Sequence, residues 1–508
     1  MRKILSILFC VLAFGFFLPQ YAGADWTFMV YLDADNNLES AGIDDFLEMA
    51  SVGSDSNVNI VVQFDRISGY DTSYGNWTEC HRFLVTSEMT PETANAVSDW
   101  GDGSGGREVN MADPQNLINF ATWAMTNYPA DNYALILWNH GGGWRDYNTA
   151  DLPIYKAVCW DDTSGGDSLY MSEVKSALTS IDHVNLVGFD ACLMGMIEVA
   201  YEIKDLASVM VASQETEPGD GWPYDTLLVD LAADPGMDAA SLGAAIVTRY
   251  GEDYGSNSDT TQSAVDLIAV DALASTVDAL AVAMMDSSKS EIAAARASSQ
   301  EYAYPEHIDL YNFAELLSGG SSNTDVQTAC ANVMTAVQSA VIANFNGNLS
   351  PDSYGVAIYF PETIGSFDSD YNDSIIDFPA GTEWDEFLSW YYSSGGDGIT
   401  LLNPTDGAVL SGSSLPTFSW EAGPDYAFKI LFSTMPFFPK GFSTFEMPGY
   451  TMMTGNSTDF IPVNYWQIAW NIIKINEQAG GIIYWRVVGI NGPGGSIEAS
   501  EIRSFSIE

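Results

Sequence analysis

Short apolar runs alternate with helix-patterned stretches along most of this chain, and this alternation restricts the fold more than any other feature. The runs typical of buried strands are Phe28–Leu32, Asn59–Phe64, Ala134–Trp138, Asn185–Phe189, Ser208–Ala212 and Gly355–Phe360. Apolar residues at helical spacing, such as Leu38, Phe46 and Met49, mark the segments between them. Strands that alternate with helices predict an α/β fold whose mostly parallel sheet is covered on both faces. In such folds the functional residues follow the carboxyl ends of the strands.

A glycine- and serine-rich stretch at residues 393–400 separates this part of the chain from a segment of different character. Beyond it, short alternating or aromatic runs at Pro416–Trp420, Phe428–Phe432 and Tyr484–Ile490 are divided by Gly, Pro and Asn. That rhythm predicts a small all-β sandwich domain. We therefore expect an α/β domain over residues 25–392, a linker over 393–400 and a β-sandwich over 401–508.

The amino terminus has the three parts of an export signal. Arg2 and Lys3 precede the apolar run Ile4–Leu18, and Ala22-Gly23-Ala24 is a small-residue pattern that signal peptidase recognises. The apolar run is too short for a comfortable membrane span. We expect a signal peptide over residues 1–24 and a mature, secreted or extracellular protein without a membrane span. Periplasmic and surface-attached forms are the alternatives.

Acidic residues greatly outnumber basic ones: 68 Asp and Glu face 17 Lys and Arg, for a formal net charge of −51. A charge of this size repels nucleic acids and anionic membranes, so we exclude both as partners. It attracts basic ligands. Solubility in an extracellular medium is the alternative explanation for most of the charge.

The cysteines are few and widely spaced. Beyond the export signal, Cys80, Cys159, Cys192 and Cys330 remain, without CxxC or Cys/His metal spacing. A long chain with so few cysteines is not a disulfide scaffold. The spacing also predicts no zinc site.

A histidine and a cysteine directly follow two of the predicted strands. His140 comes after Ala134–Trp138 and precedes Gly141-Gly142-Gly143, where the backbone can approach a substrate closely. Cys192 follows a later strand and precedes an expected helix through Ala200, whose amino end would favour a thiolate. A turn histidine and a small buried thiol are the alternatives. Together the two residues predict a Cys–His dyad for nucleophilic catalysis.

Four blocks of sequence resemble the clostripain family of cysteine peptidases. They are Trp26–Leu38, Trp138–Trp144, Phe189–Gly195 and Ser213–Trp222, and they occur in the family's order. The similarity extends from about Trp26 to Tyr392. The carboxyl-terminal segment lies outside it.

This resemblance implies a caspase-like α/β/α sandwich and cleavage after arginine or lysine. Cys192 would be the nucleophile and His140 the general base and acid. The backbone N–H groups of Gly141 and Cys192 would stabilise the oxyanion. Asp190 and Asp220 would line the pocket for the basic side chain through charge-assisted hydrogen bonds. A helix N-cap is a further role for Asp190.

The resemblance also implies self-cleavage between the two dyad residues. The candidate bonds follow Arg145, Lys156 and Lys175. The context of Lys156–Ala157 resembles the family's processing site, so we expect a monomer, or a nicked two-chain form cut there.

No cofactor is expected, with calcium as the one alternative. Some members of the family depend on calcium, and oxygen ligands follow the first strand at Asp33, Asp35, Asn36, Asn37 and Glu39. The same residues suit the N-cap and first turn of the following helix.

Two functions are compatible with this pattern, and a third is not. The first is a secreted cysteine endopeptidase that acts on polypeptides with arginine or lysine at the cleavage site. The second is a catalytically idle, surface-binding protein, because Leu402–Gly407, Trp420 and Tyr484–Val488 look like a fibronectin type III-like module. A dinucleotide-binding enzyme is excluded, since the turn Asp33–Asn37 lacks the glycines of a phosphate-binding loop.

Overall fold

The computed structural model describes residues 23–144, 158–363, 366–368, 371, 376–392, 399–412, 414–422, 426–433, 444–446, 471, 482–491, 497–499 and 502–507. Residues 1–22 of the predicted signal peptide lie outside this set. The first strand includes Ala24, which pairs with Ala130. Regular structure therefore begins one residue before the predicted amino terminus of the mature protein, at residue 25.

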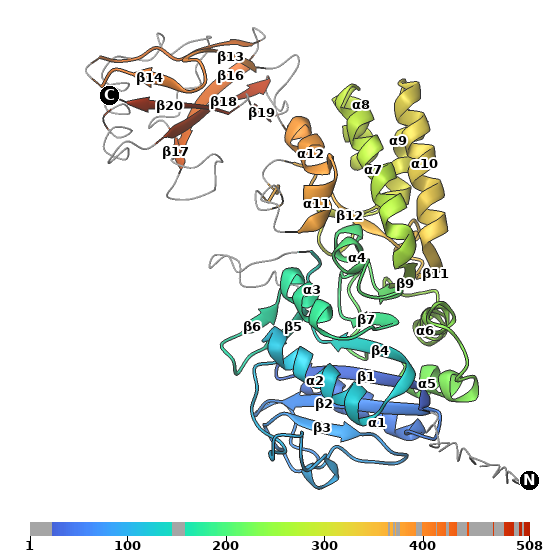
Figure 1. Cartoon of the computed structure of the whole chain (residues 1–508). Helices are drawn as coiled ribbons and strands as arrows, with labels where there is room; N and C mark the ends of the chain where they lie inside the picture. The colour runs from blue at the N-terminus through green and yellow to red at the C-terminus, as the bar shows by residue number, and fades with distance from the viewer. Residues whose placement is uncertain are drawn as a thin grey trace, which may run out of the picture.

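The described residues form an eight-stranded central sheet in the order β11-β9-β8-β7-β4-β1-β2-β3 (Figure 1). Its strands are β1 (Ala24–Ala34), β2 (Val58–Arg66), β3 (His81–Leu84), β4 (Ala130–Trp138), β7 (Leu186–Asp190), β8 (Val209–Ala212), β9 (Thr261–Asp266) and β11 (Val341–Asn346). The central strands β8, β7, β4, β1 and β2 are parallel neighbours. The outer pairings β11–β9, β9–β8 and β2–β3 are antiparallel. The predicted mostly parallel sheet is therefore confirmed.

Strand β1 shows why the central strands are apolar throughout. Phe28 and Val30 point into the core on one face of the sheet, while Met29 and Tyr31 point into the core on the other. Alternate residues of a strand face opposite sides, so a strand covered on both faces needs apolar residues at every position.

Helices cover both faces of this sheet. The first face carries α1 (Glu39–Val52), α5 (Tyr224–Ala233) and α6 (Ala239–Tyr254). The second carries α2 (Pro114–Asn127), α3 (Met171–Ser180), α4 (Ile197–Ile203), α7 (Val270–Met285), α8 (Lys289–Arg296), α9 (Leu310–Gly320), α10 (Thr324–Ala340), α11 (Asp377–Gly381) and α12 (Trp384–Tyr392). The result is the expected α/β/α sandwich.

Two short antiparallel pairs lie outside the central sheet. β5 (Val158–Asp161) pairs with β6 (Asp167–Leu169), and β10 (His307–Asp309) pairs with β12 (Ala357–Tyr359). The predicted strand Gly355–Phe360 is therefore β12 and does not belong to the central sheet. Its apolar side chains are buried among the helices instead.

One segment within the described residues is long and apolar enough to cross a membrane, namely Leu267–Met285, which contains α7. In this fold α7 packs against α10 and α12. Its apolar residues Val277, Leu280 and Met284 belong to the protein core.

The described residues of the carboxyl-terminal segment form small β-sheets, as predicted. Its strands are β13 (Ile399–Asn403), β14 (Ala408–Leu410), β15 (Ser419–Ala422), β16 (Tyr426–Ser433), β17 (Thr444–Glu446), β18 (Ile483–Asn491), β19 (Ile497–Ala499) and β20 (Arg503–Ile507). They form two sheets around a core that includes Phe418, Trp420 and Trp485. β13 begins two residues before the predicted domain boundary. The fibronectin type III-like identity stays a prediction.

Candidate active site

The two predicted catalytic residues follow neighbouring strands. β4 and β7 are parallel and adjacent, and Trp138 at the end of β4 pairs with Asp190 at the end of β7. His140 and Cys192 come shortly after these paired ends. The fold thus brings both residues to one edge of the sheet, as the strand pattern predicted.

Gly141 lies directly against the backbone of Cys192. A β-carbon at position 141 would fall 2.2 Å from the Cys192 carbonyl oxygen and 3.0 Å from its nitrogen. No side chain fits in that space. Glycine at this position therefore allows the segment after His140 to pass beside Cys192.

Among the cysteines of the described residues, Cys192 alone is partly exposed; Cys80, Cys159 and Cys330 are buried free thiols. The Glu217 backbone nitrogen donates to the Cys192 Sγ at 3.3 Å, and the Glu217 carbonyl oxygen lies 3.9 Å from the same sulfur. Burial raises the pKa of the Cys192 thiol, although the Glu217 N–H opposes this shift. The free protein therefore favours a neutral thiol.

The segment after Cys192 is a turn held in an unusual backbone conformation. Leu193 has a φ of 67°, which is uncommon for a residue with a side chain. Its N–H donates to the Glu215 carbonyl oxygen at 3.1 Å. Helix α4 begins only at Ile197. The expectation that a helix amino end lies beside Cys192 is wrong, because four residues separate Cys192 from the first residue of α4.

Asn37 orients the imidazole of His140. The His140 Nε2 lies 2.9 Å from the Asn37 Oδ1, and the Trp160 ring centroid lies 5.2 Å from that of His140. Burial lowers the pKa of His140, whereas Asp162 raises it. A neutral imidazole is the form that can accept a proton from a thiol. Within the part of the chain that the structure describes, no hydrogen bond joins this ring to Cys192.

Asp190 is buried close to the predicted nucleophile, with an exposed fraction of 4%. Its Oδ2 accepts hydrogen bonds from the Tyr224 hydroxyl at 2.7 Å and the Trp222 N–H at 3.3 Å. Burial raises the pKa of Asp190 to about 6, and its hydrogen bonds limit that rise. The alternative role as a helix N-cap is wrong, because the N-cap position of α4 is Met196.

Asp220 is exposed and lines an acidic cavity of about 530 Å³. The carboxylates of this cavity belong to Asp44, Asp45, Glu48, Asp220, Asp225 and Asp253. A β-carbon on Gly221 would lie 2.9 Å from the Asp45 Oδ2 and 3.3 Å from both carboxylate oxygens of Asp190. Asp190 therefore lies against Gly221, the neighbour of Asp220, and the fold brings both predicted pocket acids to one region.

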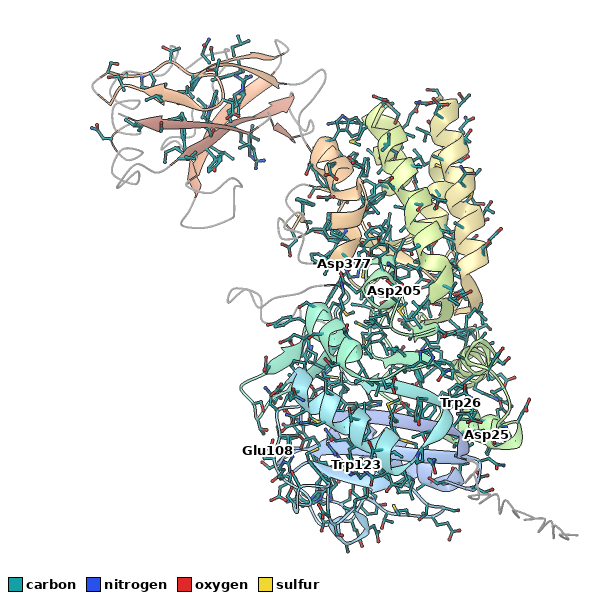
Figure 2. All side chains as sticks on the ribbon, viewed as in Figure 1. Asp25, Trp26, Glu108, Trp123, Asp205 and Asp377 are labelled. Atoms are coloured by element: carbon teal, nitrogen blue, oxygen red, sulfur yellow. The ribbon has the colours of Figure 1, made fainter. Side chains whose placement is uncertain are left out.

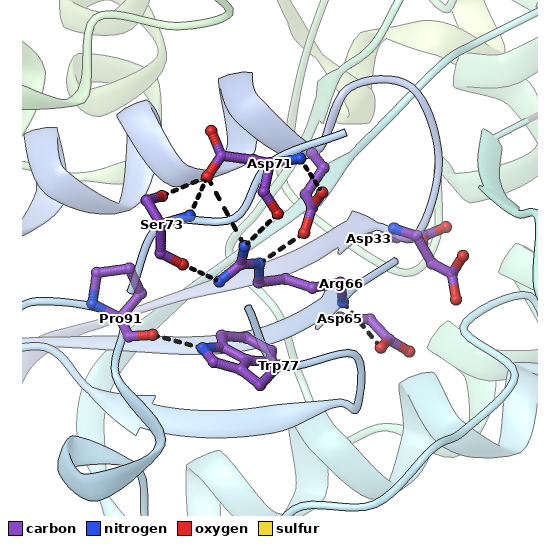
Figure 3. A network of polar contacts seen from close by, with 9 residues as sticks. Asp33, Asp65, Arg66, Asp71, Ser73, Trp77 and Pro91 are labelled. Atoms are coloured by element: carbon purple, nitrogen blue, oxygen red, sulfur yellow. Dashed lines mark hydrogen bonds and ion pairs between the residues drawn. The ribbon is translucent and has the colours of Figure 1, made fainter. Parts of the chain in front are cut away.

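The oxygen-rich run after β1 does not gather around one point. Asp33 Oδ2 accepts a hydrogen bond from Asn139 Nδ2 at 2.8 Å. Glu39 Oε1 forms a fully buried ion pair with Arg66 Nε at 2.8 Å. Arg66 is labelled in the polar network of Figure 3. Because these side chains have separate partners, the predicted run does not form one ligand set for calcium.

A different group of acids does converge. Asp35, Asp65, Glu108 and Asp161 each offer a carboxylate oxygen, and these oxygens lie within 4.8 Å of one another. All except Glu108, labelled in Figure 2, are buried. Asp65 Oδ2 has no hydrogen-bond partner among the described residues, and Asp65 Oδ1 accepts only the Arg66 N–H. Such an oxygen-only set, with a buried unsatisfied carboxylate, fits a hard divalent cation such as calcium.

The predicted cleavage pair Lys156–Ala157 lies outside the described residues. The strand that follows, β5, begins with two fully buried residues. The Trp160 carbonyl oxygen accepts a hydrogen bond from Asn139 Nδ2 at 3.0 Å. Residues just beyond the predicted cut therefore support the loop that carries His140.

The sequence analysis missed two contacts of the dyad. Glu217 meets Cys192 through backbone atoms, for which the residue type gives no signal. The sequence pattern indicated only an oxygen ligand or a helix N-cap and first turn for Asn37. Its place after β1, the neighbour of β4, is the signal that could have linked it to His140.

Comparison with known proteins agrees with this geometry. The sequence profile of the clostripain family, peptidase C11, matches residues 30–391. Clostripain from Hathewaya histolytica is 28% identical, and the match covers 72% of this chain and 79% of that protein.

Solved structures show the same fold. A secreted C11 cysteine protease from Bacteroides thetaiotaomicron, in complex with an irreversible peptide inhibitor, is 20% identical with a TM-score of 0.54, covering 72% of this chain and 100% of its own. An inactive zymogen C11 protease from Parabacteroides distasonis is 19% identical with a TM-score of 0.53, covering 72% and 99%.

The family profile spans nearly the whole α/β domain, from β1 to α12, and includes every dyad and pocket residue described above. This chain therefore belongs to the clostripain family of cysteine peptidases.

Proposed function

We propose that this chain is an exported endopeptidase that hydrolyses peptide bonds after arginine or lysine. The observation that carries the proposal is the placement of Cys192, the one partly exposed cysteine of the described residues, at the sheet edge that also holds His140. The export signal in the sequence supports an extracellular location, as does the description of a structural relative as secreted.

In the proposed reaction, His140 takes the thiol proton while the Cys192 sulfur attacks the scissile carbonyl carbon. Asn37 occupies Nε2 of the ring, so Nδ1 is the nitrogen left to exchange this proton. The Gly141 and Cys192 N–H groups stabilise the oxyanion, and the close backbone approach at Gly141 supports that role. His140 then protonates the leaving amine, and water hydrolyses the thioester.

Specificity for a basic side chain is supported by the acids beside the dyad. Asp190 is buried and hydrogen-bonded, and Asp220 lines an acidic cavity. A buried carboxylate forms a charge-assisted hydrogen bond with guanidinium or ammonium that a neutral side chain cannot replace.

Self-cleavage after Lys156 is part of the same proposal. A peptidase specific for lysine or arginine would meet its own preferred residue there. The buried start of β5 would keep the new amino-terminal segment in place after the cut. We expect the protein to act as a monomer, intact or as two associated pieces, without a membrane span or a nucleic-acid partner.

Calcium binding is proposed at Asp35, Asp65, Glu108 and Asp161. A bound cation would neutralise mutual repulsion among four carboxylates. It would also join three strands of the fold. Asp161 is the last residue of β5, Asp35 directly follows β1, and Asp65 lies near the end of β2. This contribution would be structural.

Peptide substrates that differ only in arginine, lysine or alanine before the cleaved bond test the function. The wild-type protein should cleave the first two, and Cys192→Ala should lose all turnover. Cys330→Ala, which removes a buried thiol from α10, should retain activity. A Cys192→Ala protein with wild-type rates would overturn the assignment, and a wild-type protein that cleaves nothing would favour the idle, surface-binding alternative.

A further inference from the structure

Residues 213–217, here called the β8 extension, continue the chain beyond the end of β8 and lie against the turn that carries Cys192. The Gly195 N–H of this turn donates to the Ser213 carbonyl oxygen at 2.7 Å. A β-carbon at Gly195 would fall 2.8 Å from the Ser213 carbonyl carbon, so the two backbones are in close contact. At the far end of the β8 extension, the Glu217 N–H donates to the Cys192 Sγ at 3.3 Å. The β8 extension therefore determines which backbone groups meet the sulfur.

Strand β9 holds the β8 extension through buried polar side chains. The Thr261 Oγ1 accepts hydrogen bonds from the Gln214 N–H at 2.9 Å and from the Glu215 N–H at 3.1 Å. The Gln262 Nε2 donates to the Glu217 Oε1 at 2.9 Å. Thr261 and Gln262 are both buried. A hydroxyl oxygen has two lone pairs and buried N–H groups need partners, so Thr261 is the residue that fixes the backbone of this segment.

The surroundings of Cys192 oppose ionisation of its thiol. Burial raises the thiol pKa most, and the charges of Glu215 and Asp190 add to the rise. Two backbone N–H groups oppose it, namely that of Glu217 and that of Cys192 itself. In the proposed reaction the Cys192 N–H serves the oxyanion, so the Glu217 N–H is the donor of the two that remains with the sulfur.

We propose that the Glu217 backbone N–H is a catalytic group that stabilises the Cys192 thiolate, and that Thr261 is the positioning residue that keeps this N–H at the sulfur. The inference rests on the proposed function and adds two residues that the sequence did not indicate. When the thiol ionises, the S–H bond breaks, the proton bonds to His140, and the electron pair stays on the sulfur. The hydrogen bond from Glu217 then becomes charge-assisted and stronger.

The Glu217 peptide group meets the thiol in both of its forms. Its carbonyl oxygen lies 3.9 Å from the Cys192 Sγ, where it can accept the neutral S–H. Its N–H is nearer, with the nitrogen 3.3 Å from the sulfur. Because electrostatic interactions weaken with distance, the N–H outweighs the carbonyl oxygen once the sulfur is negative. The peptide group therefore favours the thiolate.

The titratable groups that face the thiol come from three parts of the fold. Asp190 ends β7, Glu215 and Glu217 belong to the β8 extension, and His140 follows β4, whose end pairs with that of β7. Each ionised acid among them disfavours the thiolate. Variants that test the N–H must therefore carry the same charges as each other.

The first comparison is between Glu217→Ala and Glu217→Pro. Both remove the carboxyl group, but only proline also removes the N–H. The rate at which iodoacetamide alkylates Cys192, followed by mass spectrometry as a function of pH, gives the pKa of the thiol because the thiolate is the reacting form. The other thiols of the described residues are buried, so they should not react in the folded protein.

We expect the thiol pKa to be about one unit higher in Glu217→Pro than in Glu217→Ala. Below that pKa, alkylation of Glu217→Pro should then be about 10-fold slower, because a hydrogen bond to a charged group is lost. At high pH, where both thiols are ionised, the two rates should be equal.

The second comparison leaves the Glu217 peptide intact and decides the question where proline prevents folding. Thr261→Val removes the hydroxyl with little change of shape, and Thr261→Ser retains it. Ser263→Ala is the matched control, because Ser263 is a buried β9 residue whose hydroxyl donates to the Gly355 and Ala212 carbonyl oxygens instead. We expect Thr261→Val to raise the thiol pKa and to lower kcat/KM for an arginine peptide at neutral pH by roughly 3- to 10-fold. Thr261→Ser and Ser263→Ala should match the wild type.

Equal thiol pKa values in Glu217→Ala and Glu217→Pro, or in Thr261→Val and Ser263→Ala, would overturn this inference. They would leave the proposed function intact as long as the wild type cleaves after arginine. Slower alkylation at every pH, without a shift in pKa, would show that the β8 extension only covers the thiol, and would also overturn the inference. A wild-type protein that cleaves no peptide overturns the proposed function and this catalytic role together.

Discussion

The Asn37 Oδ1 lies 2.9 Å from the His140 Nε2, and in the proposed mechanism this contact leaves Nδ1 as the ring nitrogen that exchanges a proton. The amide oxygen can only accept, so Nε2 carries a hydrogen and Nδ1 has the free lone pair. In the proposed reaction, a proton received by His140 would increase the strength of this hydrogen bond and so stabilise the imidazolium.

Removing this contact should slow the chemical step. We expect Asn37→Ala to lower kcat about 10-fold or more, because a hydrogen bond to a charged group is lost. Asn37→Asp should instead move the acidic limb of the pH–rate profile upward, since a carboxylate raises the pKa of the imidazole. Asn119→Ala, which truncates an exposed amide on α2, is the control and should change neither. An unaltered pH profile in Asn37→Asp would contradict this role.

Asp190→Asn should weaken basic substrates selectively. The asparagine can still accept from Tyr224, but it provides no negative charge, so kcat/KM for arginine and lysine peptides should fall roughly 10- to 150-fold. Peptides with a neutral residue before the cleaved bond should be affected little. Asp220→Asn should show the same selectivity with a smaller effect, because Asp220 is exposed and solvent screens its charge. Equal loss on all peptides would indicate a role in folding.

Self-cleavage should divide the mature chain after Lys156. Mass spectrometry of the wild type is expected to give pieces that correspond to residues 25–156 and 157–508, which should elute together in size-exclusion chromatography. The association follows from the buried residues of β5 and their bonds to the His140 loop. Cys192→Ala and Lys156→Ala should remain uncut. A cut in Cys192→Ala would show that another protease makes it.

Chelation should destabilise the protein if a cation joins the four converging acids. A ligand present at about 100 times its dissociation constant stabilises the native state by about 2.7 kcal/mol, so EDTA should lower the melting temperature by several degrees and added calcium should restore it. In Asp65→Asn this response should disappear, whereas in the exposed variant Asp131→Asn it should persist. A wild-type melting temperature that is the same with EDTA and with calcium would exclude the site.

Stability should depend on pH through Glu198. This residue is fully buried, and its Oε1 accepts from the Tyr359 N–H at 2.9 Å and the Tyr371 hydroxyl at 2.8 Å. Burial raises its pKa from 4.5 to about 7, so the folded protein holds this proton more tightly than the unfolded chain. Stability is therefore lost as pH rises from the unfolded to the folded value, by roughly 3 kcal/mol at most.

Glu198→Gln should accordingly raise the free energy of unfolding at pH 8 and leave it nearly unchanged at pH 4. Denaturant unfolding at the two pH values measures this difference. The exposed variant Glu92→Gln should show no comparable change. An equal effect of Glu198→Gln at both pH values would contradict the raised pKa.

The strand pattern predicted the positions of His140 and Cys192 well because it depends on local order. Apolar runs that are covered on both faces become parallel strands, and residues after their carboxyl ends meet at one edge. The same reasoning failed for β9, whose sequence Thr261–Asp266 is largely polar, and for β12, whose apolar residues pack outside the main sheet. The sequences of β9 and β12 do not indicate which strands they will pair with.

The surroundings of the dyad could not be predicted in the same way. Asp35, Asp65, Glu108 and Asp161 come from four separate segments, and no spacing in the sequence links them. Glu217 meets Cys192 through backbone atoms, which every residue type has. The helix expected beside Cys192 begins only at Ile197, because a turn intervenes.

The sequence by itself determined the alternation of strands and helices, the strongly acidic charge and the residues able to carry out thiol chemistry. The tertiary structure decided which of these groups lie together and whether they are charged. The pKa values of Cys192, His140, Asp190 and Glu217 all depend on burial, which is produced by segments distant in the chain. Composition fixes how many ionisable groups the protein has, but only packing sets the solvent and the neighbours that each group meets.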